Sequence, residues 1–140
     1  MPLKIYKIEE SHGVNIPLVD SSVHAGFPSP AQDYIQDKLD INSIVISHPS
    51  TTFCAHVEGD CMIDANIHDG DIAVIDRSLE PHNGSMVVSF IDGEFTLRYI
   101  EITDKGIFLR SANPNYKKIK VEEGNDFMIW GVVTYTIHKH

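Results

Sequence analysis

MVVSFIDGEFTLRYI, residues 86–100, is the stretch of sequence that decides the fold. Residues 86–91 and 95–100 are rich in β-branched and aromatic side chains, which favour strands. The Asp92-Gly93 pair between the two runs is typical of the two-residue turn of a β-hairpin. This stretch therefore predicts two antiparallel strands joined by a tight turn.

Short apolar runs of the same kind lie on both sides of the hairpin. They are Ile44–Ile46, Thr52–Val57, Ile72–Ile75, Ile107–Leu109 and Phe127–Ile137. Turn residues separate the runs at intervals of about eight to twelve residues, a pattern typical of β-sandwiches and β-barrels. We therefore expect a mainly β domain.

The first 30 residues have a different character. They contain Gly13, Pro17, Gly26, Pro28 and Pro30 among short apolar stretches, a composition that suits an extended arm better than a helix. The following residues predict the chain's only helix, over 29–40, with Ser29 as its N-cap and Pro30 at its first position. Its apolar side chains recur at helical spacing: Ala31, Tyr34, Ile35 and Leu39.

The charge of the chain excludes some classes of function. The 140 residues carry 11 Lys and Arg against 20 Asp and Glu, a formal net charge of −9. Proteins that bind DNA directly usually present clustered basic residues, so we expect no direct DNA binding. The chain has no apolar run of about 18 residues and no signal-peptide pattern, so we expect a cytoplasmic protein without a membrane segment.

The two cysteines, Cys54 and Cys61, are too few for a disulfide framework. His48 and His56 lie nearby, but their spacing does not match that of a structural zinc site. A group of aspartates also misses the calcium-loop pattern and is better explained as turn and strand-end residues. These are Asp64, Asp69, Asp71 and Asp76. We expect neither a metal ion nor a cofactor.

Two short motifs carry chemical interest. In Gly59–Ile63, a glycine turn after a strand displays Cys61, which is either a nucleophile or an ordinary loop cysteine. In Ala25–Pro28, small residues in an extended segment either enter a cleft or form a plain linker. Taken singly, neither motif decides between its two interpretations.

Taken in order, these motifs resemble the UmuD-like proteins. The similarity begins at about residue 16 and continues to the C-terminus. It rests on AGFPSPA from Ala25, HPS from His48, GDCMID from Gly59, DGD from Asp69, DGEFT from Asp92 and WGVV from Trp130. Several motifs in one order are far more specific than any one of them.

The resemblance implies a fold and an activity. UmuD-like proteins group with LexA-like repressors as self-cleaving serine peptidases of the SOS response, dimers with a β-rich peptidase domain and an N-terminal arm. RecA filaments stimulate removal of the arm, and the shortened dimer joins a UmuC-like Y-family polymerase. Carried over, the cleaved bond is Ala25–Gly26, the arm is residues 1–25 and the peptidase-like and dimerisation domain is residues 26–140. The nucleophile position is Cys61 and the general-base position is Arg98.

Those two positions depart from the family pattern, which has serine and lysine there. A desolvated lysine loses its proton and can then accept one from the serine hydroxyl. Arginine stays protonated, so Arg98 cannot act as the base. A thiol needs less activation, however, and a fixed guanidinium favours the thiolate of Cys61.

Two functions follow from this departure. The leading hypothesis is a UmuD-type accessory protein that forms a homodimer. It binds a UmuC-like polymerase and RecA but does not cut itself. The rival is an active autopeptidase that uses Cys61 as its nucleophile. We do not expect a LexA-type repressor, because the 25 residues before the expected cleavage bond are too few for a helix-turn-helix domain.

Overall fold

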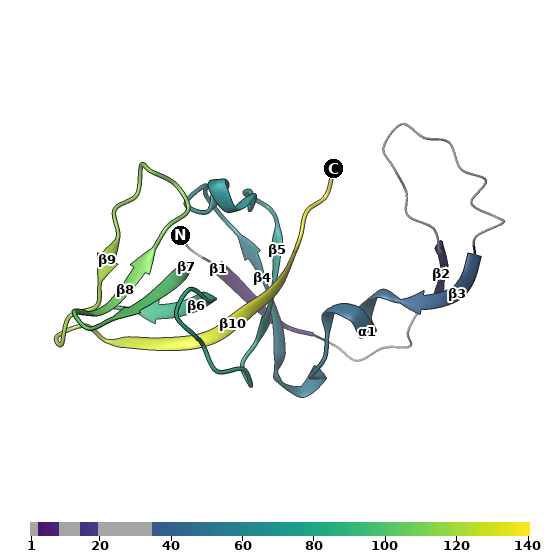
Figure 1. Cartoon of the computed structure of the whole chain (residues 1–140), viewed down its shortest axis with the longest axis horizontal. Helices are drawn as coiled ribbons and strands as arrows, with labels where there is room; N and C mark the ends of the chain where they lie inside the picture. The colour runs from purple at the N-terminus through teal and green to yellow at the C-terminus, as the bar shows by residue number, and fades with distance from the viewer. Residues whose placement is uncertain (1–2, 9–14, 20–34) are drawn as a thin grey trace. The chain divides into compact units, whose positions relative to one another are not determined.

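The computed structural model describes residues 3–8, 15–19 and 35–140 (Figure 1). The chain forms two compact units, and each is described here by itself. The larger unit comprises Met1–Glu9 and His48–His140, and the smaller comprises Glu10–Ser47. Among the residues that the structure describes, no helix has the length and apolar character that a membrane span requires.

Eight strands of the larger unit form one antiparallel sheet, so the expected mainly β fold is confirmed. Their order in the sheet is β1-β4-β5-β10-β6-β7-β8-β9. The strands are β1 (Leu3–Lys7), β4 (Thr52–Val57), β5 (Ile72–Asp76), β6 (Met86–Ile91), β7 (Glu94–Thr103), β8 (Gly106–Arg110), β9 (Ile119–Lys120) and β10 (Phe127–Ile137). Two 3-10 turns, Pro49–Thr51 and Ile63–Ala65, lie before β4 and between β4 and β5.

The predicted hairpin is β6 and β7. Phe90 pairs with Phe95 and Ile91 with Glu94, which leaves Asp92 and Gly93 as the turn. Both turn residues have positive φ, 48° and 91°, as the tight hairpin turn requires. The rings of Phe90 and Phe95 lie edge to face across the two strands, with centroids 5.3 Å apart.

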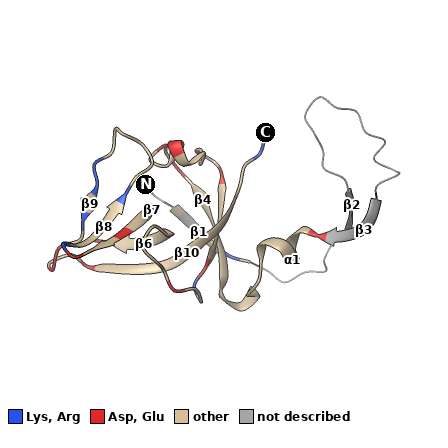
Figure 2. Cartoon of the chain, in the orientation of Figure 1, with Lys and Arg blue, Asp and Glu red and all other residues tan. Residues whose placement is uncertain are grey.

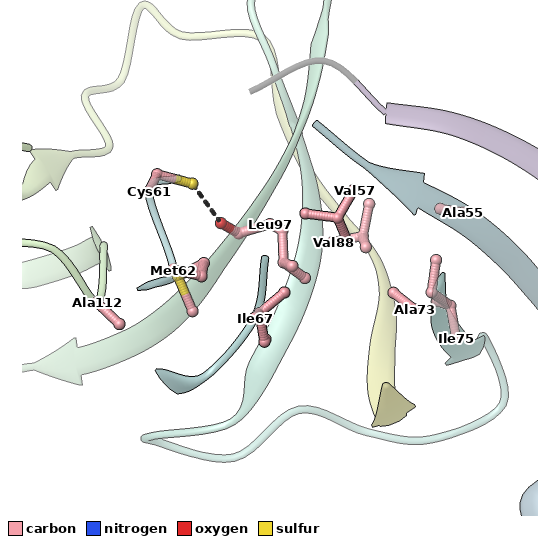
Figure 3. Packing of buried hydrophobic residues seen from close by; sticks show 10 residues of the cluster. All are labelled: Ala55, Val57, Cys61, Met62, Ile67, Ala73, Ile75, Val88, Leu97 and Ala112. Atoms are coloured by element: carbon pink, nitrogen blue, oxygen red, sulfur yellow. Dashed lines mark hydrogen bonds between the residues drawn. The ribbon is translucent and has the colours of Figure 1, made fainter. Parts of the chain in front are cut away.

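A buried apolar cluster lies against the central strands (Figure 3). Val57, Ile75, Val88 and Leu97 come from four strands, and none is more than 1% exposed. Burying a side chain of this size contributes about 1.5–3 kcal/mol, so the cluster is a major source of the unit's stability. The cluster also includes Cys61 and therefore reaches the motif that the sequence singled out.

The long strand β10 runs across the larger unit, with β6 to β9 on one side and β5, β4 and β1 on the other (Figure 1). Its first half pairs with β6 and its second half with β5. Gly131 lies at the changeover, directly after an irregularity in the β6 pairing. A Cβ atom there would lie 2.5 Å from Cγ2 of Ile75, so only glycine fits without displacing its neighbour.

Strand β1 belongs to the segment that we expected as an extended arm. Its five residues pair antiparallel with β4, from Leu3 opposite Val57 to Lys7 opposite Phe53. Leu3 and Ile5 are partly buried against the apolar cluster. The start of the chain therefore forms one edge of the large sheet, which the sequence pattern did not reveal.

The smaller unit corrects two expectations. Ile35–Asp40 is strand β3, paired with β2 (Asn15–Val19), so the predicted helix over 29–40 is wrong for these residues. Residues 29–34 lie outside the described part. Helix α1 spans Ile41–Val45, where we expected a strand, and Asp40 caps it by accepting a hydrogen bond from the amide of Asn42. Apolar residues four positions apart, such as Ile35 and Leu39, lie on one face of either a helix or a strand. The pairing with β2 favours the strand.

Asp76 anchors the segment before β4 to the end of β5. Its buried carboxylate accepts hydrogen bonds from Thr51 Oγ1 at 2.9 Å and Ser78 Oγ at 2.7 Å, and it lies 2.5 Å from His48 Nδ1. Burial alone raises the pKa of Asp76. The hydrogen bonds from His48, Ser78 and Thr51 outweigh burial and lower this pKa from 3.8 to about 2.

We expect this carboxylate to make the protein sensitive to acid. A lowered pKa in the folded state stabilises the fold above pH 3.8, and the contribution of about 2 kcal/mol disappears as the pH falls toward 2. Asp76→Asn is therefore expected to lower the free energy of unfolding at neutral pH and to flatten its decline between pH 4 and pH 2. Denaturant titrations over this range measure both effects.

Asp126→Asn is the matched control, because it makes the same chemical change at a carboxylate that is exposed to solvent. It is expected to leave the pH dependence unchanged. If the free energy of unfolding fell equally steeply with pH in the Asp76→Asn variant and in the unchanged protein, the role given to Asp76 would be contradicted.

Candidate active site around Cys61 and Arg98

Cys61 lies on a tight turn that follows β4. Gly59 adopts a φ of +89°, a left-handed conformation that glycine takes without strain. Its amide donates to Asp69 Oδ1 at 2.7 Å, and the amide of Ile63 donates to the carbonyl of Asp60 at 3.1 Å. The turn therefore has a fixed shape and places Cys61 between β4 and the following 3-10 turn.

The side chain of Cys61 points into the protein, toward Leu97 (Figure 3). It is 1% exposed, and Sγ donates a weak hydrogen bond to the carbonyl of Leu97 at 3.9 Å. Met62 and Ala112 belong to the same buried cluster. The position that the sequence identified as a nucleophile is thus part of the hydrophobic core.

Arg98 follows Leu97 on β7 and faces the same turn. It is 5% exposed, and its Nη1 donates to Cys61 Sγ and to the carbonyl of Leu97, each at 2.8 Å. Its Nε is buried and has no hydrogen-bond partner among the described residues. The structure therefore brings together the two positions that the resemblance pairs, although they lie 37 residues apart in the sequence.

Two opposing effects act on the thiol of Cys61. Burial raises its pKa, because the interior disfavours the thiolate, and the Arg98 guanidinium lowers it. Burial is the larger effect, so the pKa of Cys61 lies above its usual value of 9.0. At neutral pH the site therefore holds a protonated thiol beside a positively charged guanidinium.

A loop after β8 holds the Cys61 turn from outside. Asn113 Nδ2 donates to the carbonyl of Asp60 at 2.9 Å, and Tyr116 Oη donates to Asp60 Oδ1 at 2.8 Å. The amide of Asp64 donates to the carbonyl of Ala112 at 2.7 Å. Sequence reasoning missed this clamp, because its residues lie about 50 positions from the turn and form no recognisable motif.

The other predicted site residues separate into two groups. Ala25 and Gly26, the expected cleavage site, lie outside the described residues. The aspartates considered as ligands have other partners: Asp69 holds the Gly59 turn, and Asp71 accepts from the amide of His68 at 2.8 Å. Within residues 3–8, 15–19 and 35–140, no group of three or more His, Cys, Asp or Glu side chains is arranged to hold a metal ion.

Comparison with known proteins identifies the family. The sequence pattern of the family described as Peptidase S24-like matches residues 17–134, which include Cys61, Arg98 and most of the large sheet. The chain belongs to the Peptidase S24-like family. The resemblance inferred from the motifs is therefore confirmed at the level of the family.

Named relatives of this Peptidase S24-like chain cover most of its length. The protein SamA of Salmonella typhimurium is 40% identical over 123 residues, 88% of this chain and 85% of SamA. The protein MucA of Escherichia coli is 38% identical over 138 residues, 95% of this chain and 94% of MucA. The protein ImpA of Escherichia coli is 38% identical over 124 residues, 88% of this chain and 83% of ImpA.

The two thiols of this Peptidase S24-like protein are expected to react slowly with iodoacetamide at neutral pH. Burial raises the pKa of both Cys54 and Cys61, and Cys61 is the more deeply buried. We expect Cys54 to react first, and both to react more slowly than a small free thiol. Mass spectrometry of labelled peptides measures the two rates, and labelling in denaturant, where the rates converge, is the control. Faster labelling at Cys61 than at Cys54 would contradict the protonated, enclosed thiol.

Proposed function

We propose that this chain is a UmuD-type accessory protein of an error-prone translesion polymerase in the SOS response, and that it is unable to cleave itself. The family, the similarity to SamA, MucA and ImpA over most of their lengths, and the ordered motifs support the accessory role. The contact between Cys61 and Arg98 is the observation that carries the second part.

The chemistry of that contact opposes peptide-bond cleavage. Attack on the carbonyl of Ala25 needs either a thiolate or a base that takes the thiol proton. The raised pKa of Cys61 leaves little thiolate at neutral pH, and Arg98 carries donors only. The Nη1 donor already points at Sγ, so the guanidinium occupies the place where a base must stand.

The active autopeptidase is the second candidate, and the 2.8 Å distance from Arg98 Nη1 to Cys61 Sγ favours it. In this reaction the thiolate attacks the carbonyl carbon of Ala25, the bond to the Gly26 nitrogen breaks, and the leaving amine takes up a proton. Water then releases the acyl group from sulfur. Arginine does not supply the proton to the amine, because its guanidinium stays charged. This lack of an acid places the candidate second.

The remaining parts of the proposal concern organisation and partners. Residues 1–25 are the arm and residues 26–140 the peptidase-like domain, which forms a homodimer in the cytoplasm. The partners are a UmuC-like polymerase and the RecA filament, which hold the DNA themselves. The net charge of −9 supports this division, because it disfavours direct binding of the chain to DNA.

An experiment with two readouts tests the proposal. The purified chain is incubated with RecA, single-stranded DNA and an ATP analogue, and its mass is measured under denaturing conditions. We expect the mass of the intact 140 residues. In parallel, the chain is passed over an immobilised UmuC-like polymerase, to which we expect it to bind.

Each readout can contradict one part of the proposal without affecting the other part. A product that begins at Gly26 would contradict the silent site and support the autopeptidase. Absence of binding to the polymerase, with the chain folded and intact, would contradict the accessory role. A UmuD-like protein with serine and lysine at the two dyad positions is the positive control for both steps.

A further inference from the structure

A run of basic residues lies on one edge of this acidic protein. Residues 105–120 contain five of the 11 Lys and Arg residues of the chain and no Asp or Glu. They fall on β8, β9 and the segment that joins these strands, where Figure 2 shows blue at the end of β8 and on the chain leading into β9. The residues are Lys105, Arg110, Lys117, Lys118 and Lys120.

An open groove of about 570 Å³ lies beside this run. Its wall includes one acidic residue, Asp64, beside two basic residues, Arg110 and Lys118, and the polar and aromatic residues Tyr99, Ser111 and Tyr116. Neither Cys61 nor Arg98 lines it, but Asn113 and Tyr116, which hold the Cys61 turn, do; the groove therefore lies beside the candidate active site and leaves out its two reacting side chains. A volume of this size accommodates a few side chains of an extended peptide.

The positive charges at the groove are only partly balanced. The carboxylate of Glu101 forms salt bridges with both Arg110 Nε at 2.8 Å and Lys118 Nζ at 2.7 Å, so two positive charges share one negative charge. Lys117 and Lys120 are exposed, and neither has a carboxylate within 4.0 Å among the described residues. A ligand with negative charges would therefore meet cations that the protein itself leaves available.

The hydroxyl of Ser111 is a hydrogen-bond donor without an acceptor among the described residues. The residue is 9% exposed, lines the groove, and its Oγ has no hydrogen-bond partner among the described residues. A buried polar group without a partner costs about 1–3 kcal/mol, and native proteins rarely retain one without a reason. A carboxylate oxygen in the groove would accept a hydrogen bond from this hydroxyl.

We propose that this groove binds an acidic, extended segment of a partner protein. Carboxylates of the segment pair with Arg110 and Lys118 and with the neighbouring Lys117 and Lys120, and one accepts from Ser111. Nucleic acid fits less well, because a long polyanion would extend beyond the basic edge onto a chain of net charge −9. A short peptide places its charges within the groove alone.

Fluorescence anisotropy with the full chain tests this site. The probe is a short, fluorescently labelled peptide rich in glutamate, and the comparison probes are its glutamine counterpart and a single-stranded oligothymidylate. We expect the glutamate peptide to bind most tightly and to weaken as salt is added. The exposed double variant Lys117→Gln/Lys120→Gln is expected to weaken binding about fivefold to tenfold, and Ser111→Ala about threefold.

A charge-matched variant separates a site from general attraction. Lys7→Gln/Lys139→Gln removes two exposed lysines outside the groove and is expected to leave the affinity unchanged. Equal losses in the two double variants would overturn the proposal, and so would tighter binding of the oligothymidylate than of the glutamate peptide. Each variant's thermal unfolding is measured, so that a loss of affinity is read only from folded protein.

Discussion

The double variant Cys61→Ser/Arg98→Lys is expected to cut itself between Ala25 and Gly26 when it meets RecA, single-stranded DNA and an ATP analogue. A lysine amine at position 98 lies in the same buried surroundings as the guanidinium, which is 5% exposed. Desolvation there favours the neutral amine, which accepts the proton of a serine hydroxyl at position 61. General-base catalysis contributes about 10²–10⁴-fold in rate, so the change is from an intact chain to one that is largely cut.

The single variants provide the matched controls. Cys61→Ser alone keeps the arginine and has no base, so we expect it to stay intact. Arg98→Lys alone tests whether a thiol with a base suffices, and we expect it to cut more slowly than the double variant. A well-folded double variant that stays intact would contradict the assignment of these two residues as the dyad positions.

Gly131→Ala is expected to cause the largest loss of stability from adding a single methyl group. The new Cβ would lie 2.5 Å from Cγ2 of Ile75 and 3.4 Å from Cγ of Arg77. Ile75 is fully buried and branched at Cβ, so it has no alternative rotamer that moves Cγ2 away without strain. Overpacking of this kind costs about 1–3 kcal/mol, which denaturant unfolding measures directly.

Gly124→Ala is the matched control for this substitution. A Cβ atom at Gly124 meets nothing within 4 Å, and the residue lies on the surface. Its free energy of unfolding is expected to change by no more than about 0.5 kcal/mol. A loss at Gly131 no greater than the loss at Gly124 would show that β10 shifts freely at the changeover and would contradict the tight fit.

Six strands of the large sheet, β4 to β8 and β10, were predictable because one physical signal dominates each of them, whereas β1 and β9 were not. The hairpin of β6 and β7 combines two β-rich runs with an Asp92-Gly93 turn, and its register follows from the turn. The smaller unit lacks such agreement. Ile35 and Leu39 are four residues apart, a spacing that suits a helix or a strand, and the partner strand β2 is remote in sequence.

In the candidate site, too, the short sequence motifs were predictable, and the contacts between residues far apart in the sequence were not. The resemblance singled out Cys61 and Arg98 from the sequence, and in the structure Arg98 Nη1 lies 2.8 Å from Cys61 Sγ. The balance of burial and charge on the thiol was not predictable, because it depends on the packing of Leu97 and Met62 around it. The clamp from Asn113 and Tyr116 was also hidden, since only the folded chain brings the loop to Asp60.

The pairing of β1 with β4 would separate scission of the chain from release of its N-terminal segment. Hydrolysis after Ala25 would break the covalent link to the N-terminal segment, but the five paired residues of β1 and the packing of Leu3 and Ile5 lie far upstream of that bond. Such a cut would turn an intramolecular strand into a bound peptide, whose departure would depend on its own dissociation rate and on the protein concentration. Scission and release would therefore be distinct steps, and a partner strand that competes for the edge of β4 would set the timing of release.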